Sequence, residues 1–294
     1  MSALFPTVPL VSHTLSHDTP PAIPPVTHAI TDPDDPRIAE YRDVRERDLV
    51  GRRGLFMAEG EVVLRLLAGR GGAGTAGALV SVLVSEASAP RIADALALLP
   101  PQVEIYVAGQ KVMDRIVGFP IHRGILAVGR ARAPMEVPDL LAGLKPRALV
   151  VAVIGLANHD NMGGIFRNAA AFGADAVVLD ASCCDPLYRK AIRVSVGASL
   201  IVPTAWSSNA PTMLGALADA GFALLSLSPS GAQDLATLAR PPRVAAIFGT
   251  EGPGLPPQVL AATQTVAIPM APGFDSLNVA TTSGIVLHHL ARGG

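Results

Sequence analysis

The feature that most constrains the fold is a strict alternation of apolar strands and helices in the second half of the chain. Short apolar runs typical of strands occur at residues 149–155, 176–179, 200–204, 223–227, 244–248 and 265–268. Helical patterns occupy residues 164–172, 211–220 and 277–290. Apolar strands separated by helices predict a mostly parallel sheet with helices on both faces. In such sheets ligands bind at loops that leave the carboxyl ends of strands, so the chemistry is expected there.

The first half of the chain is organised differently. Residues 1–28 contain six prolines and no sustained periodicity, which predicts a flexible or extended arm. Residues 29–133 are expected to form a smaller α/β/α domain. Within it, helix-like stretches at 37–49, 59–68 and 90–98 alternate with β-rich runs at 79–84, 103–107 and 124–128. Residues 134–146 are expected to be a linker to the second domain, residues 147–294.

Composition excludes several classes of protein. A chain of 294 residues that is 50% hydrophobic and 16% charged has enough apolar material for two globular domains. Its apolar runs are shorter than the roughly 20 residues that span a bilayer, and no signal-peptide pattern opens the chain. The adjacent Cys183 and Cys184 offer neither an easy disulfide nor a spaced pair for zinc. We therefore expect a cytoplasmic protein without a metal site.

The net charge of −1 is not that of a typical nucleic-acid binder, which carries a basic excess against phosphate. Arginines do gather between residues 37 and 53, but acidic residues are interleaved with them. That mixture is more typical of a solvated, salt-bridged helix face than of an RNA platform.

The loop after the first strand of the second domain carries amides, glycines and a cation. Residues 158–168 include Asn161, Gly163 and Arg167. Glycine lets backbone amides approach a ligand, and Arg167 lies far enough along the following helix to project toward the same pocket. A helix cap at Asn161 and a surface arginine are the alternative.

The loop after strand 244–248 is a glycine-rich turn with one carboxylate, Glu251. Its backbone, beginning at Gly249, suits close approach to a ligand, and Glu251 is placed to pair with an arginine or orient a hydroxyl. A plain turn with a solvated glutamate is the alternative.

The loop after strand 265–268 opens a helix with short hydrogen-bonding side chains. It contains Ile268, Met270, Ser276, Leu277 and Asn278. Serine and asparagine at a helix start are ordinarily N-caps, which is the alternative to a role in binding.

Together, in this order and each after a predicted strand, the three loops resemble the signature motifs of the SpoU/TrmH family within the SPOUT superfamily. The pattern Asn-x-Gly-x-x-x-Arg is met at 161–167, Gly-x-Glu-x-x-Gly-Leu at 249–255, and Ile-Pro-Met with Ser-Leu-Asn-Val at 268–270 and 276–279. Ala280 departs from the serine that the family often has there. Residues 36–132 more loosely resemble the L30e-type substrate-binding domain that often precedes this one.

The resemblance implies an S-adenosylmethionine-dependent RNA ribose 2'-O-methyltransferase. It further implies an α/β fold with a deep trefoil knot, and a homodimer in which both subunits contribute to each active site. By matching position, the catalytic or RNA-positioning residues are Asn161, Arg167, Glu251, Ser276 and Asn278. The residues expected around the cofactor are Gly249, Ile268, Met270 and Leu277.

Methyl transfer is an in-line displacement, so positioning does most of the work. Because an arginine has a pKa above ~12, Arg167 is expected to orient the nucleophile and stabilise a developing alkoxide rather than act as a base. Glu251 is expected to hold Arg167 or a backbone amide, and Ser276 with Asn278 to shape the cofactor pocket or grip a phosphate. The expected RNA contacts are Arg42, Arg45, Arg52, Arg53, Arg189, Lys190 and Arg193.

Two other function classes were weighed. A nicotinamide-dependent dehydrogenase is disfavoured because the GxGxxG run at 72–77 follows a helix-like segment and enters no clear helix. A non-catalytic RNA-binding or ribosome-assembly protein would keep the fold without the reaction. For the enzyme, the separate N-terminal domain favours ribosomal RNA as substrate, with transfer RNA as the alternative.

Overall fold

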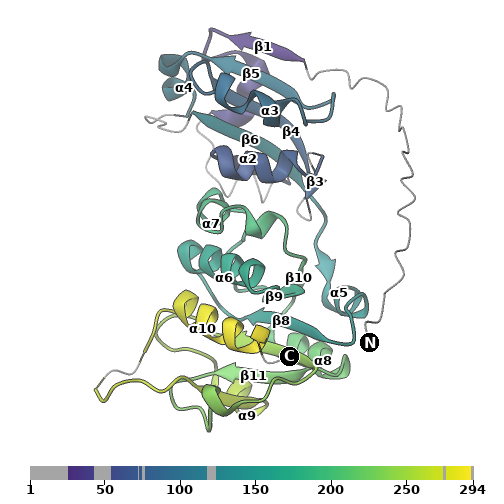
Figure 1. Cartoon of the computed structure of the whole chain (residues 1–294), viewed down its shortest axis with the longest axis vertical. Coiled ribbons are helices and arrows are strands. Elements are labelled where there is room, and N and C mark those ends of the chain that lie inside the picture. The colour runs from purple at the N-terminus through teal and green to yellow at the C-terminus, as the bar shows by residue number, and fades with distance from the viewer. Residues whose placement is uncertain are drawn as a thin grey trace, which may run out of the picture.

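The computed structural model describes residues 26–42, 54–71, 73–74, 77–117, 124–273 and 276–292, which form two α/β units stacked one on the other (Figure 1). Most of the expected N-terminal arm lies outside these ranges. The first domain begins slightly earlier than the sequence indicated, because β1 (Thr27–Ile30) already pairs with β5 (Glu104–Ala108).

The first domain is built on a mixed six-stranded sheet. Its main strand order is β1-β5-β4-β6-β2, with the short β3 (Ala73–Gly74) paired to β4. The remaining strands are β2 (Leu55–Glu59), β4 (Gly77–Ser85) and β6 (Ile125–Ala131). β1, β5 and β4 run parallel, whereas β6 is antiparallel to both β4 and β2. Strand ends therefore point to both edges of this sheet.

Helices cover both faces of that sheet, so the first domain has three layers. On one face lie α2 (Glu61–Ala68), η2 (Pro90–Ile92) and α3 (Ala93–Leu96). On the other lie η1 (Pro36–Tyr41) and α4 (Gln110–Val117). The helix expected over 37–49 is thus a short 3-10 turn as far as residue 41, and residues 43–53 are outside the described part.

The second domain is an eight-stranded sheet in which every pair is parallel, in the order β12-β14-β11-β13-β8-β9-β10-β7. The strands are β7 (Met135–Glu136), β8 (Ala148–Val153), β9 (Ala176–Asp180), β10 (Thr204–Ser207), β11 (Ala223–Leu227), β12 (Gln233–Asp234), β13 (Arg243–Phe248) and β14 (Gln264–Ala267). The prediction of a mostly parallel sheet is confirmed. All the carboxyl ends consequently meet at one edge.

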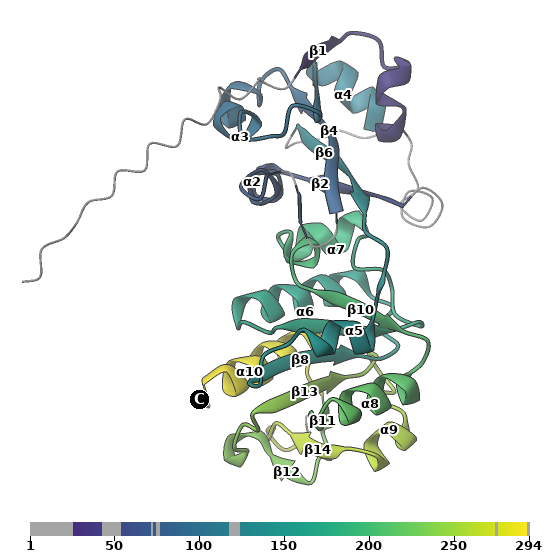
Figure 2. The same cartoon turned by 90° about the vertical axis from the view of Figure 1, so that its right-hand side faces the viewer.

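Strand β8 shows why the sheet is covered on both faces. Its side chains alternate direction, and all six are buried. Leu149, Val151 and Val153 pack toward α6 (His159–Ala171) and α10 (Val279–Arg292). The intervening residues pack toward the opposite layer, which comprises α5 (Val137–Ala142), α8 (Ala210–Asp219) and α9 (Pro257–Ala261). Figure 2 shows the sheet between these two helix layers.

Two expectations for this domain were wrong. The strand placed at 200–204 starts only at Thr204, because residues 198–200 form a 3-10 turn, η3, that buries Leu200 against the first domain. The linker at 134–146 is instead part of the second domain. Its β7 pairs with β10, and its α5 buries Leu140 and Leu141.

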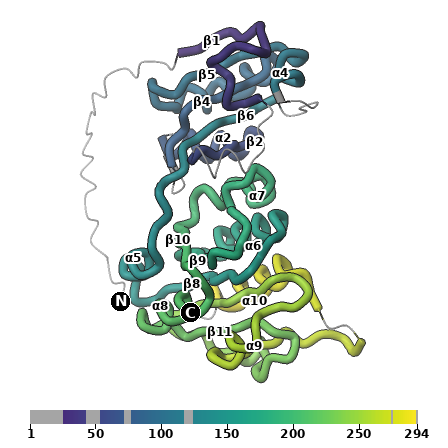
Figure 3. The backbone as a smooth tube through the Cα atoms, turned by 180° about the vertical axis from the view of Figure 1, so that it is seen from behind, coloured from purple at the N-terminus to yellow at the C-terminus, as the bar shows by residue number. Residues whose placement is uncertain are grey.

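The two domains share apolar packing. α7 (Arg189–Val194) and η3 lie between α6 and the first domain (Figure 3), and Ile192 and Leu200 join the core that contains Val63 and Leu67. Gly197, at φ +83°, allows this contact, because a Cβ there would lie 2.8 Å from Leu66 Cδ2.

Candidate functional site

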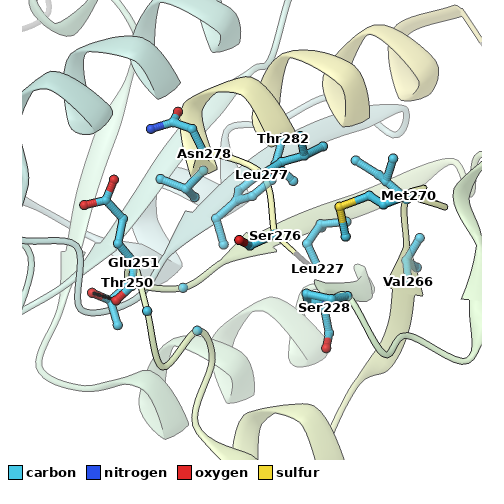
Figure 4. A pocket seen from close by; sticks show the side chains of 17 residues that line it. Leu227, Ser228, Thr250, Glu251, Val266, Met270, Ser276, Leu277, Asn278 and Thr282 are labelled. Atoms are coloured by element: carbon cyan, nitrogen blue, oxygen red, sulfur yellow. Dashed lines mark hydrogen bonds between the residues drawn. The ribbon is translucent and has the colours of Figure 1, made fainter. Parts of the chain in front are cut away.

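The carboxyl edge of the parallel sheet holds a cavity of about 380 Å³. Its walls come from the loops after β11, β13 and β14 and from the start of α10. Figure 4 shows Thr250, Glu251 and Asn278 at one end, with Val266, Met270 and Leu227 at the other. The site therefore has a polar mouth and an apolar interior, as small-molecule sites commonly do.

The loop after β13 closes tightly at Gly249. This glycine is buried, and a Cβ on it would lie 2.6 Å from both the Gly254 carbonyl carbon and the Leu255 nitrogen. An isolated bridge between Thr250 and Gly254 closes the turn. Only glycine fits at position 249, so the loop presents backbone rather than a side chain to that part of the cavity.

A hydrogen-bonded chain joins the three sequence motifs. Asn161, only 5% exposed, accepts through Oδ1 a hydrogen bond of 2.8 Å from Asn278 Nδ2. Asn161 Nδ2 in turn donates to Glu251 Oε1. Because an asparagine amide has a defined donor side and acceptor side, this arrangement fixes the orientation of the amide and of the carboxylate beside it.

Asn278 also has the capping role that was the alternative interpretation. Its Oδ1 accepts from the backbone nitrogens of Ala280 (2.9 Å) and Thr281 (3.1 Å), which satisfies the first turn of α10. The cap and the network are compatible because they use opposite ends of one amide. For α6 the cap is Asn158, not Asn161.

A second asparagine ties α10 to α6. Asn168 Nδ2 donates to the Ala280 carbonyl (2.7 Å) and to Ser283 Oγ (2.9 Å). The helices approach closely here, since a Cβ on Gly164 would lie 2.6 Å from the Ala280 side chain. The small residue at 280 therefore matches the narrow space against α6.

Arg167 is placed differently from the expectation. It lies on α6 six residues beyond Asn161, about 240° further around the helix, and its side chain is exposed while Asn161 is buried. It does not line the cavity of its own chain. Within the described residues it has no ion pair, and Glu251 is bonded to the Asn161 side chain rather than to Arg167 or a backbone amide, the two expected partners.

The other expected residues do line the cavity. Gly249, Ile268, Met270, Ser276 and Leu277 all contribute to its wall. Sequence reasoning missed the contribution of β11 and of the α10 helix, namely Leu227, Ser228, Pro229 and Thr282. The strand at 223–227 had been identified, so its carboxyl end was the signal that could have indicated the first three.

Of the four expected RNA-contacting cations that the structure describes, three are paired. Lys190 Nζ lies 2.7 Å from Asp160 Oδ2, and Arg189 lies 3.8 Å from Glu59 across the domain boundary. Arg42 contacts Asp34 at 3.3 Å. Arg193 is exposed, whereas Arg45, Arg52 and Arg53 fall outside the described residues.

Burial controls the protonation of the two cysteine thiols. It raises the pKa of the Cys183 thiol to about 12 and that of Cys184 to about 11. Across the part of the chain that the structure covers, no cluster of three or more His, Cys, Asp or Glu residues is arranged to hold a metal ion. The same part contains no helix with the length and hydropathy to span a bilayer.

Comparisons with known proteins agree with this architecture. A family model described as "SpoU rRNA Methylase family" matches residues 148–288. An uncharacterised tRNA/rRNA methyltransferase of Mycobacterium bovis is 38% identical over 277 residues, covering 90% of this chain and 92% of the relative.

Two solved structures show the same fold. An AdoMet-bound rRNA methyltransferase from Sinorhizobium meliloti has a TM-score of 0.72 and 21% identity, over 90% of this chain and 98% of the other. A crystal structure named RNA 2'-O ribose methyltransferase has a TM-score of 0.69 and 24% identity, over 91% and 99%. With the family model and the mycobacterial relative, these findings show that the chain belongs to the SpoU rRNA Methylase family of RNA methyltransferases.

Proposed function

We propose that this protein transfers a methyl group from S-adenosylmethionine to a ribose 2'-hydroxyl of RNA, with ribosomal RNA as the substrate. The observation that carries the proposal is the Asn278–Asn161–Glu251 chain at the mouth of an apolar cavity. It brings all three motif loops to one place. The names of the two solved neighbours, one AdoMet-bound and one a ribose 2'-O-methyltransferase, support the same chemistry.

The cavity suits S-adenosylmethionine in volume and in the chemistry of its lining. Its apolar wall, with Leu227, Ile268 and Leu277, suits an adenine ring, and the backbone around Gly249 suits hydrogen bonds to polar groups of the cofactor. When bound, the cofactor supplies an electrophilic methyl group on a sulfonium. The residues that would hold it are the expected Gly249, Ile268, Met270 and Leu277.

The chain's own residues provide orientation at the mouth. Glu251 presents one carboxyl oxygen to Asn161 and leaves the other available to accept a hydrogen bond from a ribose hydroxyl. Asn161 holds that carboxylate, and Asn278 holds Asn161. Ser276, at the cavity wall, is placed to contact a phosphate or the cofactor.

Arg167 is assigned to the active site of the partner subunit in a homodimer. The Arg167 side chain is exposed and leaves α6 in a different direction from the buried Asn161, so it does not contribute to the cavity of its own chain. In the partner's cavity it would orient the ribose hydroxyl and stabilise the developing alkoxide. Ile285, 40% accessible on α10, which packs against α6, is an exposed apolar side chain that favours burial against another subunit.

The trefoil knot belongs to the same proposal. After β14, the chain returns to pack α10 against α6, while the segment after β11 lies directly on β14. The Ser228 nitrogen donates to the Val266 carbonyl (3.0 Å), and a Cβ on Gly231 would lie 2.3 Å from the Val266 carbonyl carbon. The close packing of the segment after β11 on β14, together with the return of α10 to α6, supports a threaded chain.

The first domain is proposed to bind the RNA, in the manner of L30e-type domains, in the cytoplasm. Its α/β/α layering and its rigid packing on α7 support this role. RNA held by it would be positioned relative to α6, because α7 contacts both.

The test is transfer of labelled methyl from S-adenosylmethionine to RNA from cells that lack this gene, with modified riboses mapped by sequencing. Incorporation at one ribose of ribosomal RNA is expected. Incorporation into transfer RNA would correct the substrate, and none into naked RNA or ribosomal subunits would favour a binding protein. Mixing Arg167→Ala with Glu251→Ala subunits tests the dimer, since mixed dimers retain one intact site only if the two residues act across the interface.

A further inference from the structure

A second cavity, of about 360 Å³, lies between the two domains and shares no wall residue with the first. Its walls come from the end of β6, the connecting residues 132–134, the loop after β9 and strand β10. Its volume falls in the range of small-molecule sites, about 300–1,000 Å³.

The cavity contains the single tryptophan of the chain, Trp206. Alternation along β10 puts Trp206 and Thr204 on one face of the sheet, while the buried Ala205 faces the other. The indole is half-buried, and its N–H donates no hydrogen bond within the described part of the chain. An aromatic face with an unused donor is a surface on which a planar ligand stacks.

Two charged side chains of opposite sign share the cavity. Arg132 is exposed and makes no ion pair with any described residue. Asp185 Oδ1 accepts from the Leu187 nitrogen at 2.7 Å, which fixes the carboxyl group, while Oδ2 accepts nothing from the described residues. Burial raises the pKa of Asp185, so an added hydrogen-bond donor would stabilise its ionised form.

We propose that this cavity binds a guanine base of the substrate RNA, stacked on Trp206 and hydrogen-bonded by Arg132 and Asp185; the inference rests on the proposed function in taking RNA as the substrate. Guanine offers the acceptors O6 and N7, which a guanidinium recognises, and the donors N1–H and N2–H₂, which suit a carboxylate. Adenine lacks the O6 acceptor, and uracil lacks the amino group. An unstacked RNA base on an aromatic side chain is a common mode of single-strand recognition.

The guanine and the methylated ribose belong to different nucleotides. β10 and β13 are separated by β9 and β8, so the strands that wall the two cavities are at least three strand spacings apart, about 14 Å at the usual ~4.8 Å spacing. The base would thus define the position of the RNA strand, not the methylated residue.

Trp206 makes the test direct, because all tryptophan fluorescence comes from this cavity. The full-length protein is titrated, without S-adenosylmethionine, with single-stranded RNA pentamers of uracil that contain one central guanine or none, and with GMP. Saturable quenching by the guanine pentamer is expected at a concentration at least about five-fold lower than for the uracil pentamer. A pentamer that binds more tightly than GMP identifies RNA as the source of the base; GMP binding as tightly as the pentamer overturns the assignment to RNA.

Variants separate recognition from general charge. Asp185→Asn retains an acceptor for the Leu187 nitrogen but changes the other oxygen to a donor, so the guanine preference is expected to disappear while the fold is kept. Arg132→Ala is expected to reduce that preference. Arg130→Ala, which removes an exposed arginine outside the cavity, is the matched control and should leave it unchanged.

Failure here and failure of the proposed function are distinguishable. Guanine-dependent quenching without methyl transfer would support the guanine site and contradict the proposed methyltransferase activity. Methyl transfer with equal quenching by both pentamers, or with no quenching, would overturn the guanine site alone. A guanine preference retained in Asp185→Asn would also overturn it.

Discussion

The two domains have the same three-layer construction but different strand directions. The first has a mixed sheet, so its strand ends and their loops divide between opposite edges. The second has parallel pairs throughout, so the loops after β11, β13 and β14 converge on one cavity. Strand direction, more than composition, explains why the cofactor-sized site is in the second domain.

Within the second domain, the carboxyl edge is itself uneven. The loop after β13 is open to the first cavity, whereas the first residues after β9 pack against Asp180, which is 5% exposed, and residues 185–187 further along that loop line the second cavity. Asp180 accepts hydrogen bonds from the Gly155 nitrogen and Ser182 Oγ. The ends of β13 and β9, which flank β8 in the sheet, thus differ: the first faces the cavity and the second stabilises the loops around it.

The largest expected effect is at Gly249. Gly249→Ala should reduce S-adenosylmethionine binding by at least about 100-fold, because the added Cβ overlaps backbone atoms at 2.6 Å and displaces the loop. Isothermal titration calorimetry measures the affinity of each variant for S-adenosylmethionine. Gly215→Ala on α8, where a Cβ meets nothing within 4 Å, is the control and should bind normally. Normal binding by Gly249→Ala would mean that this loop does not form the site.

The next effect separates capping from function. Asn278→Ala removes a helix cap and the bond to Asn161, whereas Asn209→Ala removes the cap of α8, its 2.8 Å bond to the Thr212 nitrogen, and an exposed 3.2 Å bond to Ser208 Oγ. Both should lose about 1 kcal/mol of stability. Methyl transfer should fall roughly 100-fold in Asn278→Ala alone. Equal methyl-transfer activity in the two variants would mean that Asn278 acts only as a helix cap.

A smaller effect tests whether close packing between the two domains at Gly197 contributes to stability. Gly173→Ala, at φ +69° with open space, should cost about 1–2 kcal/mol of unfolding free energy. Gly197→Ala adds a contact of 2.8 Å with Leu66 and should cost about 1 kcal/mol more. Urea denaturation measures both. Identical losses of unfolding free energy in the two variants would show that the domain interface accommodates the added methyl group without cost.

The smallest effect concerns the start of the loop after β9, which contains Cys183 and Cys184. Because burial raises the pKa values of Cys183 and Cys184 to about 12 and about 11, above the ordinary 9.0, few thiolates exist at pH 8. Alkylation by iodoacetamide should be at least about ten-fold slower than in urea. Their stabilising contribution is complete below pH 9 and is lost as the pH rises toward 11–12. Rapid alkylation of the native protein would show that this loop opens.

The sequence by itself determined the parallel sheet and the three motif loops. Apolar strands such as β8 alternate with helices, and that pattern depends only on local periodicity and on burial of both faces. Gly249 and Asn161 are identifiable from the sequence because each lies in a loop after a predicted strand and matches the spacing of a family motif. Local patterns also misassigned segments, since α5 was interpreted as a linker and Leu200 as part of a strand.

Only the tertiary structure decided which side chains meet. Asn161 and Glu251 are 90 residues apart in sequence, and nothing local indicates that Glu251 pairs with Asn161 rather than with Arg167. The interdomain cavity likewise brings Arg132, Asp185 and Trp206 together from three separate segments. Periodicity records the direction in which a side chain leaves its own element, whereas contacts between distant segments depend on how strands are ordered and helices packed, which is a property of the whole chain.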